Sequence, residues 1–285
     1  MKYHALWNRL TSLYDPNEAK AIVRWVLEDG FGLSWADIVC DRTDELSAEE
    51  QAKLETVMQR LQQGEPVQYV LGRAAFGGRT FVVNGHVLIP RPETYELCQW
   101  ILGTSPGLPQ GEEDLRILDV GTGSGCIACT LAAELPGAKV TAWDISEEAL
   151  AVAQENARQQ GLDIGFERVD VLQAAESPGL TAGGWDIVVS NPPYICQKER
   201  AAMERNVLEH EPHQALFVPD DDPLLFYRAI AQYGQKTLRP DGWLYFEINP
   251  LYADALADML AMTGYHDIET RADQFSRQRM TRAQR

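Results

Sequence analysis

The sequence has few basic residues for its size and no long apolar run. Among its 285 residues, Lys and Arg number 25 against 42 Asp and Glu, which gives a formal net charge of −17. This excess of negative charge disfavours a general DNA- or RNA-binding protein and favours a basic protein or a cationic small molecule as the partner. No apolar run approaches the roughly 18 residues that a membrane span needs, so we expect no membrane contact.

Cysteine is also scarce, and its five residues are an odd number that cannot pair completely. The N-terminal residues lack the apolar segment of a secretory signal, so we expect reduced thiols and a cytoplasmic protein. Cys126 and Cys129, like His210 and His213, have the spacing of metal ligands, but neither pair is accompanied by a second. We therefore expect no metal and buried thiols at the two cysteines. We also expect the protein to be a monomer.

The residues that are present first indicate a helical N-terminal region. Asp15-Pro16-Asn17-Glu18 combines an N-cap aspartate, a proline at the first helical position and a glutamate, which all favour a helix start. Ser47-Ala48-Glu49-Glu50 is a capping box, and Gly64 ends the helix that follows it. We predict an all-helical substrate-recognition domain over residues 1–72, with its leucines and tryptophans in the core.

Residues 73–92 are predicted to form a linker that carries a β-hairpin. Two segments of strand-forming residues, 76–83 and 86–89, flank Asn84-Gly85, a strong turn signal for paired strands. Pro90 and Pro92 follow and separate this hairpin from the rest of the chain.

Residues 93–285 show strands that alternate with helices. The segments with a strand pattern are 116–120, 139–143, 164–169, 185–190 and 243–248, and Gly161 ends the clearest helix, residues 147–160. This alternation predicts an α/β domain with a Rossmann-like, doubly wound parallel sheet, in which ligands bind at the carboxyl ends of the strands. The C-terminal residues 271–285 are locally basic, with five arginines.

Gly121-Thr122-Gly123-Ser124-Gly125, the glycine loop, connects the first predicted strand to a helix. Glycines allow positive φ and a close approach of the backbone to a ligand, and the helix start supplies free N–H groups. A dinucleotide-binding loop would need glycine at position 126, where this chain has Cys126. The spacing instead resembles the nucleoside-binding loop of S-adenosylmethionine-dependent methyltransferases. A tight turn without a ligand is the alternative.

Residues at the ends of the next two strands are candidates for contacts with a bound nucleoside. Asp144 ends the second strand, where a carboxylate can accept hydrogen bonds from both ribose hydroxyls. The alternative for Asp144 is an acidic residue before a helix that Ser146 caps. Asp170 ends the third strand and is placed to meet an adenine amino group, with Val171 near the ring. A solvated loop acid is the alternative for Asp170.

Asn191-Pro192-Pro193-Tyr194, the acceptor loop, follows the fourth predicted strand. Its prolines stiffen the backbone and remove two N–H donors. A pair of acceptors remains, the Asn191 side-chain oxygen and the Pro192 carbonyl, with the ring of Tyr194 beside them. Two acceptors can hold the two hydrogens of a planar NH₂ group, as in glutamine or adenine, while its nitrogen faces an electrophile. A strand end stopped by prolines is the alternative.

The combination of these motifs resembles the release factor glutamine methyltransferases along nearly the whole chain. Residues 89–94, 119–125, 191–195 and 211–217 carry the resemblance. It implies that the glycine loop and Asp144 hold S-adenosylmethionine, that Val171 lines the adenine, and that the acceptor loop binds the substrate glutamine. The sequence departs from the family pattern at Tyr95, at residues 219–222 and at residues 249–252.

The resemblance implies methylation of the side-chain amide nitrogen of the glutamine in the Gly-Gly-Gln motif of peptide chain release factors, which modulates translation termination. Asn191 and Pro192 would orient this amide, Tyr194 would pack on its plane, and Asn191 would also lie near the methionine end of the cofactor. No side chain stands out as a general base.

The main alternative is an adenine-specific DNA or RNA amino-methyltransferase, because the same loop can hold a flipped base. The net charge of −17 and the lack of a basic target-recognition domain count against it. A non-catalytic scaffold is disfavoured by the intact acceptor loop and Asp144, and a nicotinamide-dependent dehydrogenase by Cys126.

Overall fold

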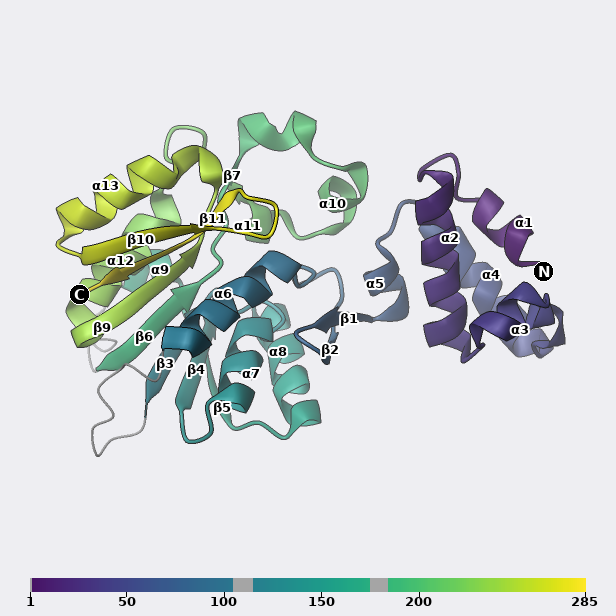
Figure 1. Cartoon of the computed structure of the whole chain (residues 1–285), viewed down its shortest axis with the longest axis horizontal. Coiled ribbons are helices and arrows are strands. Elements are labelled where there is room, and N and C mark those ends of the chain that lie inside the picture. The colour runs from purple at the N-terminus through teal and green to yellow at the C-terminus, as the bar shows by residue number, and fades with distance from the viewer. Residues whose placement is uncertain (1, 105–114, 175–183) are drawn as a thin grey trace. The chain divides into compact units, whose positions relative to one another are not determined.

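The computed structural model describes residues 2–104, 115–174 and 184–285 (Figure 1). The chain forms two compact units, one of residues 1–73 and 203–210 and the other of residues 74–202 and 211–285. No helix in the described ranges is long and apolar enough to cross a membrane. The division into a recognition domain, a linker and a catalytic domain stays a prediction.

The first unit is built from helices with well-defined starts. The Asp15 side chain accepts hydrogen bonds from the backbone N–H groups of Asn17 and Glu18, and Ser47 and Glu50 form a reciprocal capping box, so both predicted helix starts are confirmed. The elements are α1 (Tyr3–Asn8), α2 (Pro16–Trp25), the π-helical turn Val26–Gly30, α3 (Trp35–Val39), the 3₁₀ turn Arg42–Glu45, α4 (Ala48–Gln62), α5 (Val67–Leu71) and α10 (Arg205–His210).

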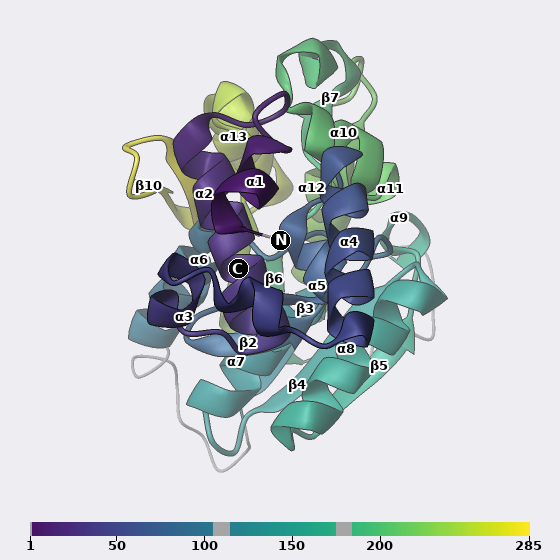
Figure 2. The same cartoon turned by 90° about the vertical axis from the view of Figure 1, so that its right-hand side faces the viewer.

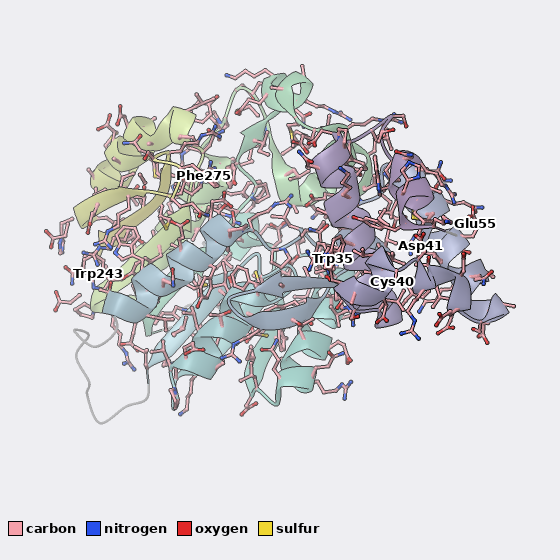
Figure 3. All side chains as sticks on the ribbon, turned by 45° about the vertical axis from the view of Figure 1, so that its right-hand side comes forward. Trp35, Cys40, Asp41, Glu55, Trp243 and Phe275 are labelled. Carbon is pink, nitrogen blue, oxygen red and sulfur yellow. The ribbon has the colours of Figure 1, made fainter. Side chains whose placement is uncertain are left out.

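Figure 2 shows α1, α2 and α4 of the first unit, and apolar side chains of these helices belong to its core. Leu6, Leu54 and Met58 are buried there, but the prediction that the leucines belong to this core is wrong for Leu13, which is 38% exposed. The prediction that the tryptophans belong to this core is wrong for Trp35, which is 44% exposed (Figure 3). The guanidinium of Arg24 lies 4.6 Å from the centre of its ring, so a long polar side chain covers part of this indole.

The hairpin that follows these helices does not have the predicted turn. β1 (Arg73–Phe76) and β2 (Arg79–Val82) pair across Gly77-Gly78 and not across Asn84-Gly85. Both glycines have positive φ, 57° and 77°, as a two-residue turn between twisted strands requires. The predicted second strand, residues 86–89, is not a strand in the structure.

Side-chain contacts explain the position of this turn. A Cβ atom at Gly77 would collide with the ring of Tyr95, so only glycine fits there. Asn84 uses its side chain locally instead: its Oδ1 accepts a hydrogen bond from the backbone N–H of His86 at 3.0 Å. Such a contact closes a loop turn without pairing two strands.

A seven-stranded sheet forms the centre of the second unit, in the order β10-β11-β9-β6-β3-β4-β5 (Figure 1). Five of the strands are the predicted ones, and neighbours among these five run parallel, which confirms the Rossmann-like α/β fold. The strands are β3 (Arg116–Val120), β4 (Lys139–Asp144), β5 (Ile164–Arg168), β6 (Trp185–Ser190), β9 (Leu238–Glu247), β10 (His266–Ala272) and β11 (Gln278–Gln284).

The sheet is mixed, however, and not purely parallel as predicted. β11 runs antiparallel to β9, and β10 runs antiparallel to β11. Both strands include residues of the basic C-terminal segment, where arginines stand in place of apolar residues. The guanidinium groups of Arg271 and Arg282 lie 4.3 and 5.1 Å from the centre of the Trp100 ring, so their stems help to cover the sheet.

Helices cover both faces of the sheet (Figure 1). One face carries α6 (Pro92–Thr104), α7 (Cys126–Glu134) and α8 (Glu147–Gln160), and the other carries α9 (Val171–Ala174), α12 (Leu225–Thr237) and α13 (Ala253–Thr263). Cys126 and Cys129 are buried on α7, as predicted.

The remaining elements are β7 (Ile195–Cys196), β8 (Phe217–Val218), α11 (His213–Leu216) and the 3₁₀ turns Gln197–Ala202 and Pro250–Tyr252.

Candidate active site

Polar residues gather where four neighbouring strands end. The register between the strands places the carboxyl ends of β3, β4, β6 and β9 at one edge of the sheet. The residues at these ends are Gly121, Asp144, Asn191 and Glu247. The first three are predicted site residues, so the structure brings the glycine loop, the second-strand acid and the acceptor loop to the same edge.

The three glycines of the glycine loop all have positive φ, but they serve two purposes. A Cβ atom at Gly125 would lie 3.0 Å from the Cβ of Ala153, so this glycine allows close packing against α8. At Gly121 and Gly123, no described atom outside the adjoining residues lies within 4 Å of such a Cβ. The backbone at these two positions therefore borders open space, which fits a ligand lying against the loop.

Thr122 and Ser124, between these glycines, are buried. The Thr122 hydroxyl donates to Asp119 Oδ2 at 2.6 Å, and Asn156 Nδ2 donates to the Ser124 carbonyl at 2.8 Å. Their predicted contacts with the cofactor stay predictions. In the structure, the Thr122 side chain and the Ser124 carbonyl hold the loop to β3 and α8.

Asp119 is a residue of this site that was not predicted, although it belongs to the matching motif 119–125. It is fully buried, and its Oδ1 has no hydrogen-bond partner among the described residues. Burial raises the pKa of Asp119 to about 7, although the hydrogen bonds from Thr122 and from the backbone N–H of Ala128 lower it. An unpartnered buried oxygen beside the glycine loop fits a ligand that brings a hydrogen-bond donor. Its signal in the sequence is a single acid within an apolar strand.

Asp144 joins the end of β4 to the glycine loop. Its Oδ2 accepts a hydrogen bond from the backbone N–H of Gly123 at 2.9 Å, and its Oδ1 accepts one from that of Ser146 at 3.0 Å. Burial raises the pKa of Asp144, and these hydrogen bonds oppose the rise. Ser146 caps α8, because its side chain accepts from the N–H of Ala149. The contact of Asp144 with a ribose stays a prediction.

Asp170 and Val171 lie where β5 gives way to α9. The Asp170 carboxylate accepts hydrogen bonds from the backbone N–H of Leu172 at 3.0 Å and from Gln173 Nε2 at 2.8 Å. Val171 is partly buried and packs against the apolar cluster of α12 and the sheet. Asp170 thus stabilises the start of a helix, and its contact with an adenine, like that of Val171, stays a prediction.

The acceptor loop is held by side chains from distant parts of the chain. Asn191 Nδ2 donates to Thr94 Oγ1 at 3.2 Å, and Asn249 Nδ2 donates to the Tyr194 carbonyl at 3.1 Å. Pro192 is buried and Pro193 is partly buried. Within the described residues, neither Asn191 Oδ1 nor the Pro192 carbonyl accepts a hydrogen bond. Both predicted acceptors are therefore available to a ligand.

Glu247, the last residue of β9, is a second site residue that was not predicted. Its side chain is buried, and its two oxygens accept from Thr94 Oγ1 at 2.6 Å and from the Tyr194 hydroxyl at 3.0 Å. Burial raises the pKa of Glu247, while these two donors and the charge of Arg279 lower it. Its signal in the sequence is again one acid at the carboxyl end of an apolar strand.

The Tyr194 hydroxyl is not a base at neutral pH. Burial raises the pKa of Tyr194 far above its usual value, and the carboxylate of Glu247 raises it further. The phenol therefore stays protonated and donates to Glu247. Tyr194 is thus excluded as a general base, and the wider absence of a general base stays a prediction.

An ion pair links two of the family-like motifs. Arg91 Nη2 lies 2.5 Å from Glu211 Oε1, and the backbone N–H of Ile89 donates to Glu211 Oε2 at 3.3 Å. Glu211 is buried, which makes this pair more than a surface contact. The segment before α6, which begins at Pro92, is thus fixed to the segment that leads into α11.

The three departures from the family pattern have structural explanations. Tyr95 packs edge-on against Phe76 with 5.5 Å between ring centres. Asp222 forms an ion pair with Arg228 at 2.8 Å. Asn249, described above, supports the acceptor loop through its side-chain NH₂.

Comparison with known proteins gives a consistent result. Residues 7–72 match the model of the PrmC N-terminal domain, and residues 107–215 match that of the Methyltransferase small domain. A crystal structure of a methyltransferase from Pyrococcus furiosus is similar in fold, with a TM-score of 0.51 and 15% identity, over 84% of this chain and 98% of that chain.

Curated relatives are similar over almost the entire length. The release factor glutamine methyltransferase of Bacteroides thetaiotaomicron is 46% identical over 276 residues, which cover 97% of this chain and 96% of the relative. That of Flavobacterium psychrophilum is 40% identical over 95% of this chain and 93% of the relative. The chain therefore belongs to the release factor glutamine methyltransferase family.

Proposed function

We propose that this protein methylates the side-chain amide nitrogen of the glutamine in the Gly-Gly-Gln motif of peptide chain release factors, with S-adenosylmethionine as methyl donor. One observation carries the proposal. Two acceptors without partners among the described residues, Asn191 Oδ1 and the Pro192 carbonyl, follow a strand that pairs directly with the strand before the glycine loop. The name of the relatives supports the choice of substrate.

The residues of the glycine-loop side fit the cofactor. Open space borders Gly121 and Gly123, the Asp144 carboxylate retains lone pairs for ribose hydroxyls, and Asp119 Oδ1 lacks a donor. When bound, S-adenosylmethionine supplies an electrophilic methyl group on a sulfonium. The protein's contribution on this side is to bind and orient that group.

The residues of the acceptor loop orient the nucleophile. An amide nitrogen reacts poorly because its lone pair is delocalised, so catalysis depends on position. Asn191 Oδ1 and the Pro192 carbonyl would accept the two amide hydrogens and so fix the direction of the nitrogen. The Tyr194 ring, held by its hydrogen bond to Glu247, would pack on the plane of the amide.

The experiment that tests this function offers the purified protein three substrates with labelled cofactor. The first is a release factor with an intact Gly-Gly-Gln motif, the second is the same protein with this glutamine changed to alanine, and the third is duplex and single-stranded DNA and RNA. We expect label only in the first, on a peptide that contains the glutamine. Label on adenine would establish the amino-methyltransferase of nucleic acids instead.

We also infer that the first unit, with its exposed acidic side chains, helps to recognise the intact release factor. The net charge of −17 supports attraction of a basic protein, which salt would weaken. We expect KM for the intact protein to rise with salt more steeply than KM for a short glutamine peptide. Glu49→Gln in the first unit should raise KM for the protein about twofold at low salt.

Asp163→Asn is the matched control for this charge change. Asp163 is also exposed and acidic, but it lies in the second unit. Equal effects of the two substitutions would mean that the charge of the protein acts as a whole and that the first unit has no special part in recognition.

A further inference from the structure

A hydroxyl group stands between the predicted substrate-orienting residue and a buried carboxylate. Thr94 Oγ1 receives a hydrogen bond from Asn191 Nδ2 at 3.2 Å and donates one to Glu247 Oε2 at 2.6 Å. Thr94 is 2% exposed and Glu247 1% exposed, so water does not compete for these contacts. The three residues come from the first turn of α6, the end of β6 and the end of β9.

The hydrogen bonds between Asn191, Thr94 and Glu247 can run in only one donor-to-acceptor direction. A carboxylate has no hydrogen to donate, so the single hydrogen of the Thr94 hydroxyl must point to Glu247. The hydroxyl can then only accept from Asn191, which must turn its NH₂ toward Thr94. The amide oxygen of Asn191 is thereby directed away from Thr94, where a ligand can donate to it.

The second oxygen of Glu247 is also engaged. It accepts from the Tyr194 hydroxyl at 3.0 Å, so both oxygens of the carboxylate receive a donor. Burial raises the pKa of Glu247, and the hydrogen bonds from Thr94 and Tyr194 and the charge of Arg279, whose guanidinium also pairs with Asp273, oppose this rise. Glu247 thus contacts Tyr194 directly and is linked to Asn191 through Thr94.

We propose that Thr94 and Glu247 are positioning residues that set the polarity of the Asn191 amide. The two ends of an asparagine amide have nearly the same shape, so packing alone does not distinguish them. In the reversed orientation, the NH₂ of Asn191 would face the NH₂ of the substrate, and two donors would meet. The proposal rests on the proposed function, since it requires a substrate that donates to Asn191.

The test compares Thr94→Val, which keeps the shape and loses the hydroxyl, with Thr94→Ser, which keeps the hydroxyl. We expect Thr94→Val to lower kcat on a Gly-Gly-Gln protein by roughly 10- to 100-fold. We expect KM and affinity for S-adenosylmethionine to change less than about threefold, and Thr94→Ser to recover most of the lost rate. A merely structural role would change cofactor affinity and melting temperature together with kcat.

A double-mutant cycle decides whether Thr94 acts through Asn191. In an Asn191→Ala background, we expect Thr94→Val to lower kcat by no more than about twofold, because there is no amide left to orient. An additional loss as large as that in the wild type would overturn the proposal. So would a Thr94→Val single variant with wild-type kcat. Failure of the wild type itself to methylate the release factor would instead refute the proposed function.

Glu247→Gln is a second variant that keeps the volume of the side chain, in case Thr94→Val does not fold. Its amide can donate to Thr94, which would then donate to Asn191 and reverse the amide. We expect a loss of kcat comparable to that of Thr94→Val, with cofactor affinity retained. A Glu247→Gln enzyme with wild-type kcat and melting temperature would overturn the role of the carboxylate.

Discussion

The glycine loop and the acceptor loop follow β3 and β6, which are neighbours in the sheet, but they keep their shapes by different means. The glycine loop depends on backbone freedom at Gly121, Gly123 and Gly125, and on the Asp144 carboxylate, which accepts from the N–H of Gly123. The acceptor loop depends on two prolines and on side chains from α6 and β9. A loop of the first kind lets a ligand approach its backbone, which borders open space at Gly121 and Gly123, and a loop of the second kind presents acceptors.

This difference matches the two ligands that the family uses. Glycine backbone that borders open space suits a cofactor that lies against the loop and is the same in every reaction cycle. A pair of aimed oxygens suits one chemical group, an NH₂, and rejects groups without two hydrogens to donate. Each loop can be altered separately, and the following predictions are ordered from the largest expected effect to the smallest.

Asn191→Ala should distinguish the functions of the two loops most clearly. It removes one of the two acceptors, so the substrate amide would rotate freely, and kcat should fall roughly 100- to 1000-fold, or about 3–4 kcal/mol in activation free energy. Cofactor affinity should change only a few-fold, since the glycine loop and Asp144 remain. Single-turnover assays and calorimetry measure the two quantities. A kcat within threefold of wild type would return the acceptor loop to a purely structural role.

Gly125→Ala should damage the glycine loop through packing. The new Cβ would lie 3.0 Å from Ala153, and the backbone has φ of 79°, so strain and overpacking together should cost about 2–4 kcal/mol of folding stability. Gly123→Ala is the matched control, because its Cβ meets only open space. It should cost about 1–2 kcal/mol for the backbone alone. Denaturant unfolding measures both, and equal losses would contradict the packing explanation.

Asp119 should make stability depend on pH. Its folded pKa, about 7, lies above the unfolded value near 3.9, so the folded state holds the proton more tightly. The contribution of Asp119 is thus fully present below pH 4 and is lost as pH rises to 7. We expect Asp119→Asn, which resembles the neutral acid, to remove about 1–3 kcal/mol of this dependence. Parallel pH curves for the two proteins would show that Asp119 does not titrate in this window.

Asp144→Ala should affect cofactor binding and leave the chemical step nearly unchanged. Loss of charge-assisted hydrogen bonds should weaken S-adenosylmethionine binding by about 1–3 kcal/mol, with kcat at saturating cofactor largely kept. Asp144→Asn, which retains one acceptor oxygen, should lie between the alanine variant and the wild type. Unchanged affinity in calorimetry for the alanine variant would exclude Asp144 from the ribose contact.

The elements with local signals were predictable from the sequence. The capping residues Asp15 and Ser47 and the terminal Gly161 mark three helix ends, and five apolar strands alternate with helices. The hairpin was misplaced because Asn84 satisfies its turn with its own side chain, and a ring distant in sequence, that of Tyr95, requires glycine at position 77. β10 and β11 went unrecognised because their arginine stems cover apolar surface.

The residues of the site also divide into those with a local signal in the sequence and those without one. Glycines, prolines and acids at strand ends are visible as motifs, so the sequence indicates the glycine loop, Asp144 and the acceptor loop, which the structure places at one edge of the sheet. Thr94 and Glu247 were not, because their contact joins residues 153 positions apart, and neither residue belongs to a local pattern that indicates the other. Such a contact exists only after the strands have been assembled in their order across the sheet.

The separation of contacts along the chain also has a consequence for the order of folding. The contact between Gly123 and Asp144 spans 21 residues, whereas those from Thr94 to Asn191 and to Glu247 span 97 and 153. Contacts between distant residues form late because a long loop must close first. During synthesis, β9 leaves the ribosome well after β3 and β4. The residues that hold the glycine loop are therefore synthesised before Glu247, which supports the acceptor loop.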